Sequence, residues 1–223
     1  MKIWQKYKQY LLSGEWHIHT NYTDGNNSVV EYCEKALEHS IPLLAFTEHV
    51  RKELRYDFSS LLEEIDKARA EYSLIILSGC EVKVLPDGSL DVVDDIIKEV
   101  DYPVFAFHSF PKNFDLFLDC LKSAITNKYI NTWAHPSIVP INMSTNIDSD
   151  VILELFKLMK EYNVLLEYNN KYNLPPQSWI KLAKEIDVLI VRGSDVHSIT
   201  DLRAREKIFL LRENVEGKKP EKP

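Results

Sequence analysis

The sequence predicts an α/β fold in which seven parallel strands alternate with helices and form a compact barrel. Short β-rich apolar runs alternate along the chain with longer segments of helical period. Strands that are joined by helical crossovers form a parallel sheet with the helices outside it. A chain of 223 residues fits a slightly short relative of the (β/α)8 barrel. An open doubly wound sheet is the alternative, but no G-x-G-x-x-G follows the first strand, which argues against a dinucleotide cradle.

The elements follow one another in a regular order. The predicted strands cover residues 15–19, 43–49, 74–82, 103–110, 130–136, 164–170 and 188–197. The predicted helices lie near residues 28–39, 58–72, 91–99, 114–127, 149–162 and 177–186. Residues that can cap a first helical turn are Asn27 or Ser28, Asp57, Asp91 and Asp148. Pro175 and Pro176 precede the last helix, where a fixed φ costs little.

The sequence also predicts the structure of the two ends of the chain. Residues 1–12 contain an amphipathic pattern, and we expect a helix there that packs on one end of the barrel. One domain is predicted over 1–214, and the polar, proline-bearing residues 215–223 are predicted to be a disordered tail.

Composition indicates an ordinary globular protein, with 45% apolar and 27% charged residues. No run approaches the roughly 18 apolar residues of a membrane span, and the start of the chain lacks a secretory signal. We therefore expect a cytoplasmic protein with no membrane partner. Cys33, Cys80 and Cys120 form no C-x-x-C pair, so we expect buried thiols instead of disulfides or a thiolate zinc site. A net charge of −7 disfavours a broad grip on nucleic acid but leaves room for a local basic patch.

Histidines concentrate at the ends of the predicted strands. Six of the seven lie there, together with two carboxylates: His17, His19, His49, His108, His135 and His197, with Glu81 and Asp195. Only His39, within a predicted helix, stands apart. The carboxyl ends of parallel barrel strands open on one face, so these side chains are expected to converge.

A single histidine at a strand end is more often a structural residue than a ligand, but the conjunction favours metal binding. Alternate residues of a strand share a face, so His17 and His19 can reach one ion while Ile18 points into packing. Imidazole with carboxylate suits zinc, manganese or iron. With Asp24, the set contains nine candidates, too many for one tetrahedral ion and suitable for two or three.

These motifs together resemble the polymerase and histidinol phosphatase (PHP) family of metal-dependent phosphoesterases. Seven of them match in family order: HIHTNYTDG (17–25), AFTEH (45–49), SGCE (78–81), FAFHSF (105–110), WAHP (133–136), LEYNN (166–170) and GSDVHS (193–198). The resemblance implies a distorted seven-stranded (β/α)7 barrel, similar to the TIM barrel, and three divalent ions, with zinc, manganese or iron as the candidates.

The resemblance also implies which residues bind each ion. The first would be held by His17, His19, Glu81 and Asp195; the second by Glu81, His108 and His135; the third by Asp24, His49 and His197. Two positions depart from the family pattern. Glu48 and Glu15 stand where aspartate is commoner, and we expect both to act on the ligands indirectly.

The activity expected is hydrolysis of a small phosphomonoester by a hydroxide that bridges two ions. Asp195 or His197 is a candidate to protonate the leaving oxygen. Arg192 and Arg51, with Lys83, are candidates to bind phosphate, whereas Lys52, Arg55 and Lys112 are expected to be solvated charges. Tyr22, Tyr168 and Asn169 either shape the pocket or pack. The alternatives are a phosphodiesterase or 3′–5′ exonuclease acting on nucleic-acid ends, and a non-catalytic scaffold stabilised by metal.

Overall fold

The computed structural model describes residues 1–142 and 147–202. Its strands are β1 (Glu15–Ile18), β2 (Leu43–Val50), β3 (Ile75–Lys83), β4 (Tyr102–Ala106), β5 (Thr132–Trp133), β6 (Leu165–Asn169) and β7 (Ile190–Gly193). They form one seven-stranded sheet in sequence order, and every neighbouring pair is parallel. The predicted strand count, order and direction are confirmed.

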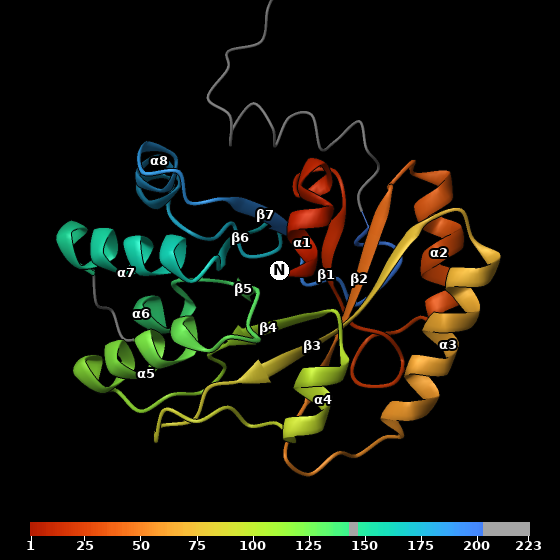
Figure 1. Cartoon of the computed structure of the whole chain (residues 1–223), viewed down its shortest axis with the longest axis horizontal. Helices are drawn as coiled ribbons and strands as arrows, with labels where there is room; N and C mark the ends of the chain where they lie inside the picture. Colours follow the sequence, from red (N-terminus) through yellow and green to blue (C-terminus); the bar gives the residue numbers. More distant parts are fainter. Residues whose placement is uncertain (143–146, 203–223) are drawn as a thin grey trace, which may run out of the picture.

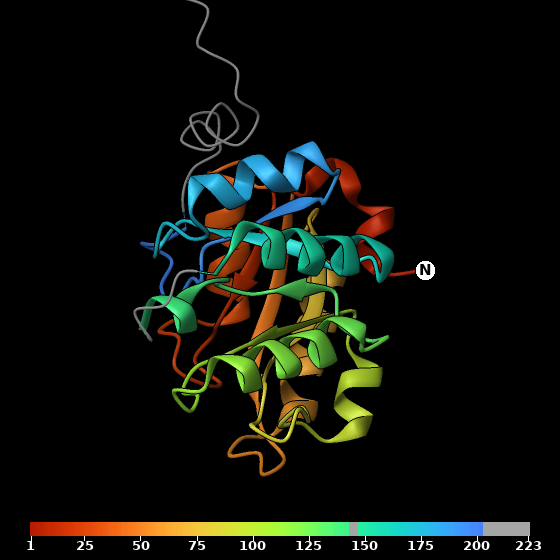
Figure 2. The same cartoon turned by 90° about the vertical axis from the view of Figure 1, so that its left-hand side faces the viewer.

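The sheet curls into a nearly closed barrel with helices around it (Figures 1 and 2). Beyond β7, the chain returns to β1: the amide of His19 donates to the carbonyl of Val196 at 2.8 Å, and the amide of Val196 donates to the carbonyl of His17 at 3.0 Å. These bonds join the segment just after β7 to the end of β1, where Ile18 and Val196 form an isolated parallel bridge. The fold is therefore the predicted (β/α)7 barrel.

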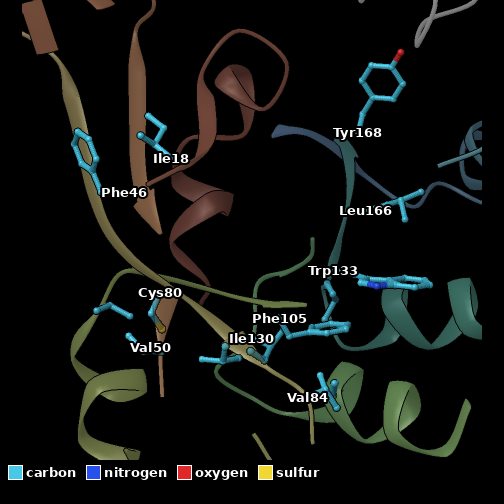
Figure 3. Close-up of a cluster of buried hydrophobic side chains, with 14 of the residues drawn as sticks. Ile18, Phe46, Val50, Cys80, Val84, Phe105, Ile130, Trp133, Leu166 and Tyr168 are labelled. Carbon is cyan, nitrogen blue, oxygen red and sulfur yellow. The ribbon is translucent and has the colours of Figure 1, made fainter. Parts of the chain in front are cut away.

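Alternation along the strands divides the core into two layers. Phe46, Cys80 and Leu166 face the helices and belong to the large outer cluster shown in Figure 3. Their strand neighbours Ala45 and Leu165 belong to a second cluster, which fills the inside of the barrel. The outer layer packs the helices against the sheet, and the inner layer supports the side chains at the strand ends, at the mouth of the barrel.

The start of the chain packs against the inside of the barrel, and it does so without forming a single helix. Residues 1–12 contain the short α1 (Ile3–Lys6) and a 3₁₀ turn (Lys8–Tyr10). Trp4 and Leu11 are 5% exposed and belong to the inner cluster. The amide of Arg192 in β7 donates to the carbonyl of Leu11 at 2.8 Å, which ties this segment to the barrel.

The helices are α2 (Val29–Glu38), α3 (Phe58–Glu71), α4 (Asp94–Glu99), α5 (Phe114–Thr126), α6 (Ile138–Asn142), α7 (Ser149–Glu161) and α8 (Gln177–Glu185). The side chains of Ser28, Asp57 and Asp148 cap helices as predicted. The expectation for Asp91 is wrong, because α4 starts three residues later and the Asp91 carboxylate accepts from the amide of Lys52 instead. The short α6 was not predicted.

Some expectations on the chain ends are not tested. The predicted tail at 215–223 lies outside the described residues, as does the end of the predicted domain.

None of the helices in the described ranges combines the length and apolar character needed to cross a bilayer. Cys33, Cys80 and Cys120 are free and buried, as the sequence predicts.

Candidate metal centre

The rows of side chains that face the inside of the barrel change from apolar to polar where the strands end. In β2, the row that includes Ala45 continues to His49, and in β3 the row that includes Leu77 continues to Glu81. The paired register places His49 beside Glu81. Because an inward position recurs every second residue, an apolar interior and a polar mouth follow from the same alternation.

Glu81 occupies the centre of the polar cluster and is fully buried. Its Oε1 lies 2.8 Å from Nε2 of His135 and 3.4 Å from Nε2 of His108. Its Oε2 lies 2.9 Å from Nδ1 of His49 and 3.5 Å from Nε2 of His19. One carboxylate thus faces imidazoles from several strand ends, an arrangement that suits a carboxylate shared between ions.

The structure brings all nine candidate ligands into this cluster. Within it, three groups have ligand atoms within 4.8 Å of one another: His17 with His19 and Asp195; His19 with Asp24, His49 and His197; and His49 with Glu81 and His108. The grouping resembles the expected three-ion assignment but differs in detail. His49 joins Glu81 and His108, whereas His135 contacts Glu81 alone among the carboxylates of the cluster.

The carboxylates and His19 of the cluster are held in forms that bind cations, whereas His17, His49 and His135 would each lose a proton on binding. Burial alone would lower the pKa of these three histidines, but the neighbouring carboxylates raise it. Burial alone would raise the pKa of Glu81, but His108 and His135 hold it well below its usual value. Burial likewise opposes ionisation of Asp195, yet the hydrogen bond from His19 and the charge of His17 lower its pKa. Burial lowers the pKa of His19 to about 4, which keeps its imidazole neutral. Ionised carboxylates and neutral imidazoles are the forms that bind divalent ions.

Two buried imidazole nitrogens also fit a metal centre. Nδ1 of His19 and Nδ1 of His135 make no hydrogen bond within the described residues. His19 presents its other nitrogen to Asp195 at 3.2 Å and has Nδ1 4.0 Å from Asp24. A buried polar atom without a partner is costly, and coordination of a cation would relieve that cost. The donor set therefore fits divalent metal ions.

Backbone strain accumulates at the same place. His135 has φ 29° and Asp195 has φ 50°, both in the left-handed region that side-chain-bearing residues rarely adopt. Such conformations cost about 1–3 kcal/mol each and persist where surrounding structure enforces them. Both lie just beyond strand ends and turn their side chains into the cluster.

Glu167 in β6 is a site residue that the sequence analysis did not single out. Its Oε2 lies 2.7 Å from Nδ1 of His17, and its Oε1 accepts from the backbone amide of His135 at 2.8 Å. A Cβ at Gly193 would lie 2.4 Å from Oε2 of Glu167, so glycine is required there for the carboxylate to fit. Its position on the inward row of the LEYNN motif was the available signal.

Glu48 and Glu15 position ligand-bearing segments, and neither lies in a candidate ligand group. Glu48 accepts from the amide of Thr20 at 2.6 Å and from the hydroxyl of Thr23, so it holds the loop that carries Asp24. Glu15 accepts from the amide of Ser194 at 2.7 Å, next to Asp195. The expectation that these carboxylates act indirectly agrees with both contacts.

The predicted phosphate-binding cations need correction. Arg192 is 1% exposed, pairs with Glu15 at 2.9 Å and donates to the carbonyl of Gly14 at 3.2 Å. It is therefore not available at the mouth as expected. Lys83 donates to Ser109 at 3.0 Å. Arg51 lies at the mouth, with Nε 3.7 Å from the Asp91 carboxylate.

Lys171, which the sequence analysis missed, lies closer to the cluster than these cations. Its Nζ is 3.1 Å from Oδ2 of Asp195 and 3.2 Å from Nδ1 of His197. It lines a cavity of 220 Å³ above the cluster, together with Tyr172. Its place two residues past β6 is again a strand-end position, and LEYNN directly precedes it.

Three expected pocket residues have separate roles. Tyr168 is 5% exposed and packs in the outer cluster, so it does not line the site. Asn169 is buried and donates to Glu167 at 2.9 Å. Tyr22 lines a second cavity beside the cluster.

The fold and the cluster define a class: a seven-stranded α/β barrel with a histidine- and carboxylate-rich candidate metal centre at its strand ends. A family comparison identifies the class more closely, because residues 15–171 match the PHP domain. The chain belongs to the PHP domain family.

Relatives in sequence carry two kinds of name, one for a polymerase with exonuclease activity and one for a probable phosphatase. The DNA polymerase/3′-5′ exonuclease PolX of Bacillus subtilis is 30% identical over 199 residues, and the match covers 84% of this chain but 35% of that protein. A probable phosphatase of Clostridium novyi is 27% identical over 210 residues, covering 85% of this chain and 80% of that protein. The chain therefore spans about a third of the polymerase and most of the phosphatase.

Solved structures support the fold. Histidinol phosphate phosphatase from Lactococcus lactis, in complex with zinc, L-histidinol and phosphate, superposes with a TM-score of 0.71. The identity is 15%, and the match covers 92% of this chain and 93% of that chain. At this identity the likeness establishes the shared barrel.

Proposed function

We propose that this protein is a metal-dependent phosphoesterase that hydrolyses a small phosphomonoester. The observation that carries the proposal is the convergence of nine histidine and carboxylate side chains around the buried Glu81. Relatives of similar length named as probable phosphatases support the same reaction class.

The site would hold three divalent ions, with zinc, manganese and iron as the candidates. His17, His19 and Asp195 would bind the first ion with Glu81, which would be shared with a second. His108 and His135 would complete the second; Asp24, His49 and His197 would hold the third. When bound, such ions supply Lewis-acid stabilisation of phosphoryl charge and activate water near neutral pH.

Residues of the chain itself would orient the phosphate and donate the proton to the leaving group. Lys171 is the described cation that directly contacts the cluster, and its ammonium would attract the phosphoryl oxygens. Burial alone would lower the pKa of Lys171, but the Asp195 carboxylate raises it, so the ammonium stays charged. His197, whose side chain is 22% exposed and borders the cavity, would protonate the leaving oxygen only while it is not bound to the third ion, because a coordinated imidazole nitrogen carries no proton.

A 3′–5′ exonuclease activity is a second candidate, because a relative with 30% identity is named for it. The chain matches about a third of that protein, and the net charge of −7 does not favour a long nucleic-acid track. A non-catalytic scaffold is the third candidate.

A substrate panel separates the three functions. Protein loaded with Mn²⁺ would be assayed with phosphomonoesters, a phosphodiester and single-stranded DNA. We expect hydrolysis of the monoesters, and loss of both activity and bound metal in His17→Ala. His39→Ala provides the matched control, because His39 lies at the end of α2 outside the cluster. Activity on DNA alone would favour the exonuclease, and no turnover would favour the scaffold.

A further inference from the structure

A second cavity of about 820 Å³ opens beside the metal centre. Most of its wall comes from the loop that joins β2 to α3, residues 51–57. Tyr22 and Tyr56 form an aromatic side, with ring centroids 6.1 Å apart. The hydroxyl of Tyr56 donates to the carbonyl of His49 at 3.2 Å, which ties this wall to the metal centre.

The two cavities share a wall. His49 borders both of them, and Thr23 of the larger cavity is next to Asp24 of the smaller one. The smaller cavity, at 220 Å³, lies below the range of roughly 300–1,000 Å³ that is usual for small-molecule sites, whereas the larger one lies within it. A substrate whose phosphate lies at the metal centre has adjoining room here for its remaining atoms.

The charges of the larger cavity favour an anion. Arg51, Lys52 and Arg55 line it, against the carboxylates of Glu53 and Asp91. Asp91 lies 3.7 Å from Arg51. Within residues 1–142 and 147–202, no carboxylate forms an ion pair with Lys52 or Arg55. Unpaired cations in a concave site attract a group of opposite charge.

We propose that this basic pocket, lined by Arg51, Lys52 and Arg55, binds the leaving group of the substrate and selects leaving groups that carry a second anionic group. The proposal rests on the proposed phosphatase function. The Tyr22 and Tyr56 rings provide a surface for the carbon skeleton between the two anionic groups. The substrate class is therefore a phosphomonoester with a carboxylate or a further phosphate on its alcohol portion.

Binding of non-hydrolysable analogues tests the pocket without relying on turnover. The probes are para-carboxybenzylphosphonate and its uncharged counterpart para-carbamoylbenzylphosphonate, titrated calorimetrically into Mn²⁺-loaded protein. We expect the carboxylate to bind about threefold to fivefold more tightly, the range for a partly exposed ion pair. Arg55→Gln and Lys52→Gln should each reduce this ratio, and the double variant should bring it to about one. A para-phosphono probe in place of the carboxylate distinguishes which anion is preferred.

Matched variants control for general charge effects. Lys181→Gln removes an exposed cation from α8 and should retain the full ratio, and Arg55→Lys should retain most of it. Equal affinities in the parent protein, a ratio that survives in the double variant, or no binding of either phosphonate would overturn the pocket assignment. If the preference is present but no phosphomonoester is hydrolysed, the pocket assignment stands and the phosphatase function fails.

Discussion

Glu167 and His17 face each other inside the barrel, with Oε2 of the carboxylate 2.7 Å from Nδ1 of the imidazole. Both side chains are buried. Burial alone would lower the pKa of His17, but the Glu167 charge raises it well above its usual value. A carboxylate at Nδ1 fixes the ring so that Nε2 points at Glu81 and Asp195, 3.7 and 3.6 Å away.

Replacing Glu167 by Gln should therefore weaken metal binding without removing a ligand. Partners of this kind typically cost 10–100-fold in metal affinity when they are replaced. Competition with a metal-sensitive chelator dye would measure the change. Glu185→Gln, on the exposed surface of α8, is the control and should bind metal like the parent protein. Unchanged affinity in Glu167→Gln would show that the His17 orientation does not depend on this bond.

Gly193→Ala should displace the Glu167 carboxylate by a steric clash. The added Cβ would lie 2.4 Å from Oε2 and 2.6 Å from Cδ of Glu167, so the side chain must move. We expect a loss of stability of about 1–3 kcal/mol, as for other overpacked core sites, measured by urea denaturation.

A double-variant cycle isolates the cause. In a Glu167→Ala background the clashing atoms are absent, so the additional cost of Gly193→Ala should shrink by most of its value. Equal costs in both backgrounds would assign the effect to the β7 backbone and contradict the proposed role of Gly193.

Strand-end residues were predictable because the alternation of a parallel strand is local. The inward rows that end in His49 and Glu81 follow from residue spacing alone. Contacts between segments that are far apart in the sequence were not predictable. Arg192 contacts Gly14, 178 positions away, and nothing in the VLIVRGSD pattern indicates that contact. The short α6 spans five residues, which is too few for a periodic signal to emerge.

The missed site residues show the same limit. Glu167 lies on an inward row in the middle of a motif, and its importance depends on the proximity of His17, 150 positions earlier. Lys171 follows β6, and a lysine after a strand is usually a solvated charge. Only the closure of the barrel brings it to Asp195.

Lys171→Met should weaken the binding of inorganic phosphate to the metal-loaded protein. A hydrogen bond to a charged group is worth about 1.5–3 kcal/mol, so the dissociation constant should rise at least tenfold. Calorimetric titration with phosphate measures it. Lys181→Met is the control, with its side chain 81% exposed on α8. Intact metal content in Lys171→Met would separate phosphate binding from damage to the cluster, and an unchanged dissociation constant would refute the role.

Removal of metal should lower thermal stability, because the ligands come from separate strand ends and an ion binds only when they are assembled. At 100 times the dissociation constant, one ion adds about 2.7 kcal/mol. For a chain of this size that amounts to a fall in Tm of about 5–10 °C after chelation. Scanning calorimetry of the loaded and chelated protein measures the difference. The fall should be smaller in His17→Ala and unchanged in His39→Ala; equal falls in both would contradict the ligand assignment.

Arg192→Ala should lower the free energy of unfolding and leave phosphate binding unchanged. The guanidinium pairs with the fully buried Glu15 at 2.9 Å, and burial, opposed by Arg192, raises the pKa of that carboxyl. Removing one partner of a buried ion pair costs about 3–5 kcal/mol, since the other charge remains without compensation. Urea denaturation measures that loss, while KM measured on the folded, metal-loaded fraction should stay near that of the parent. A KM that rises tenfold with stability intact would instead return Arg192 to the phosphate site, so the two measurements decide between a buried structural pair and a substrate-binding cation.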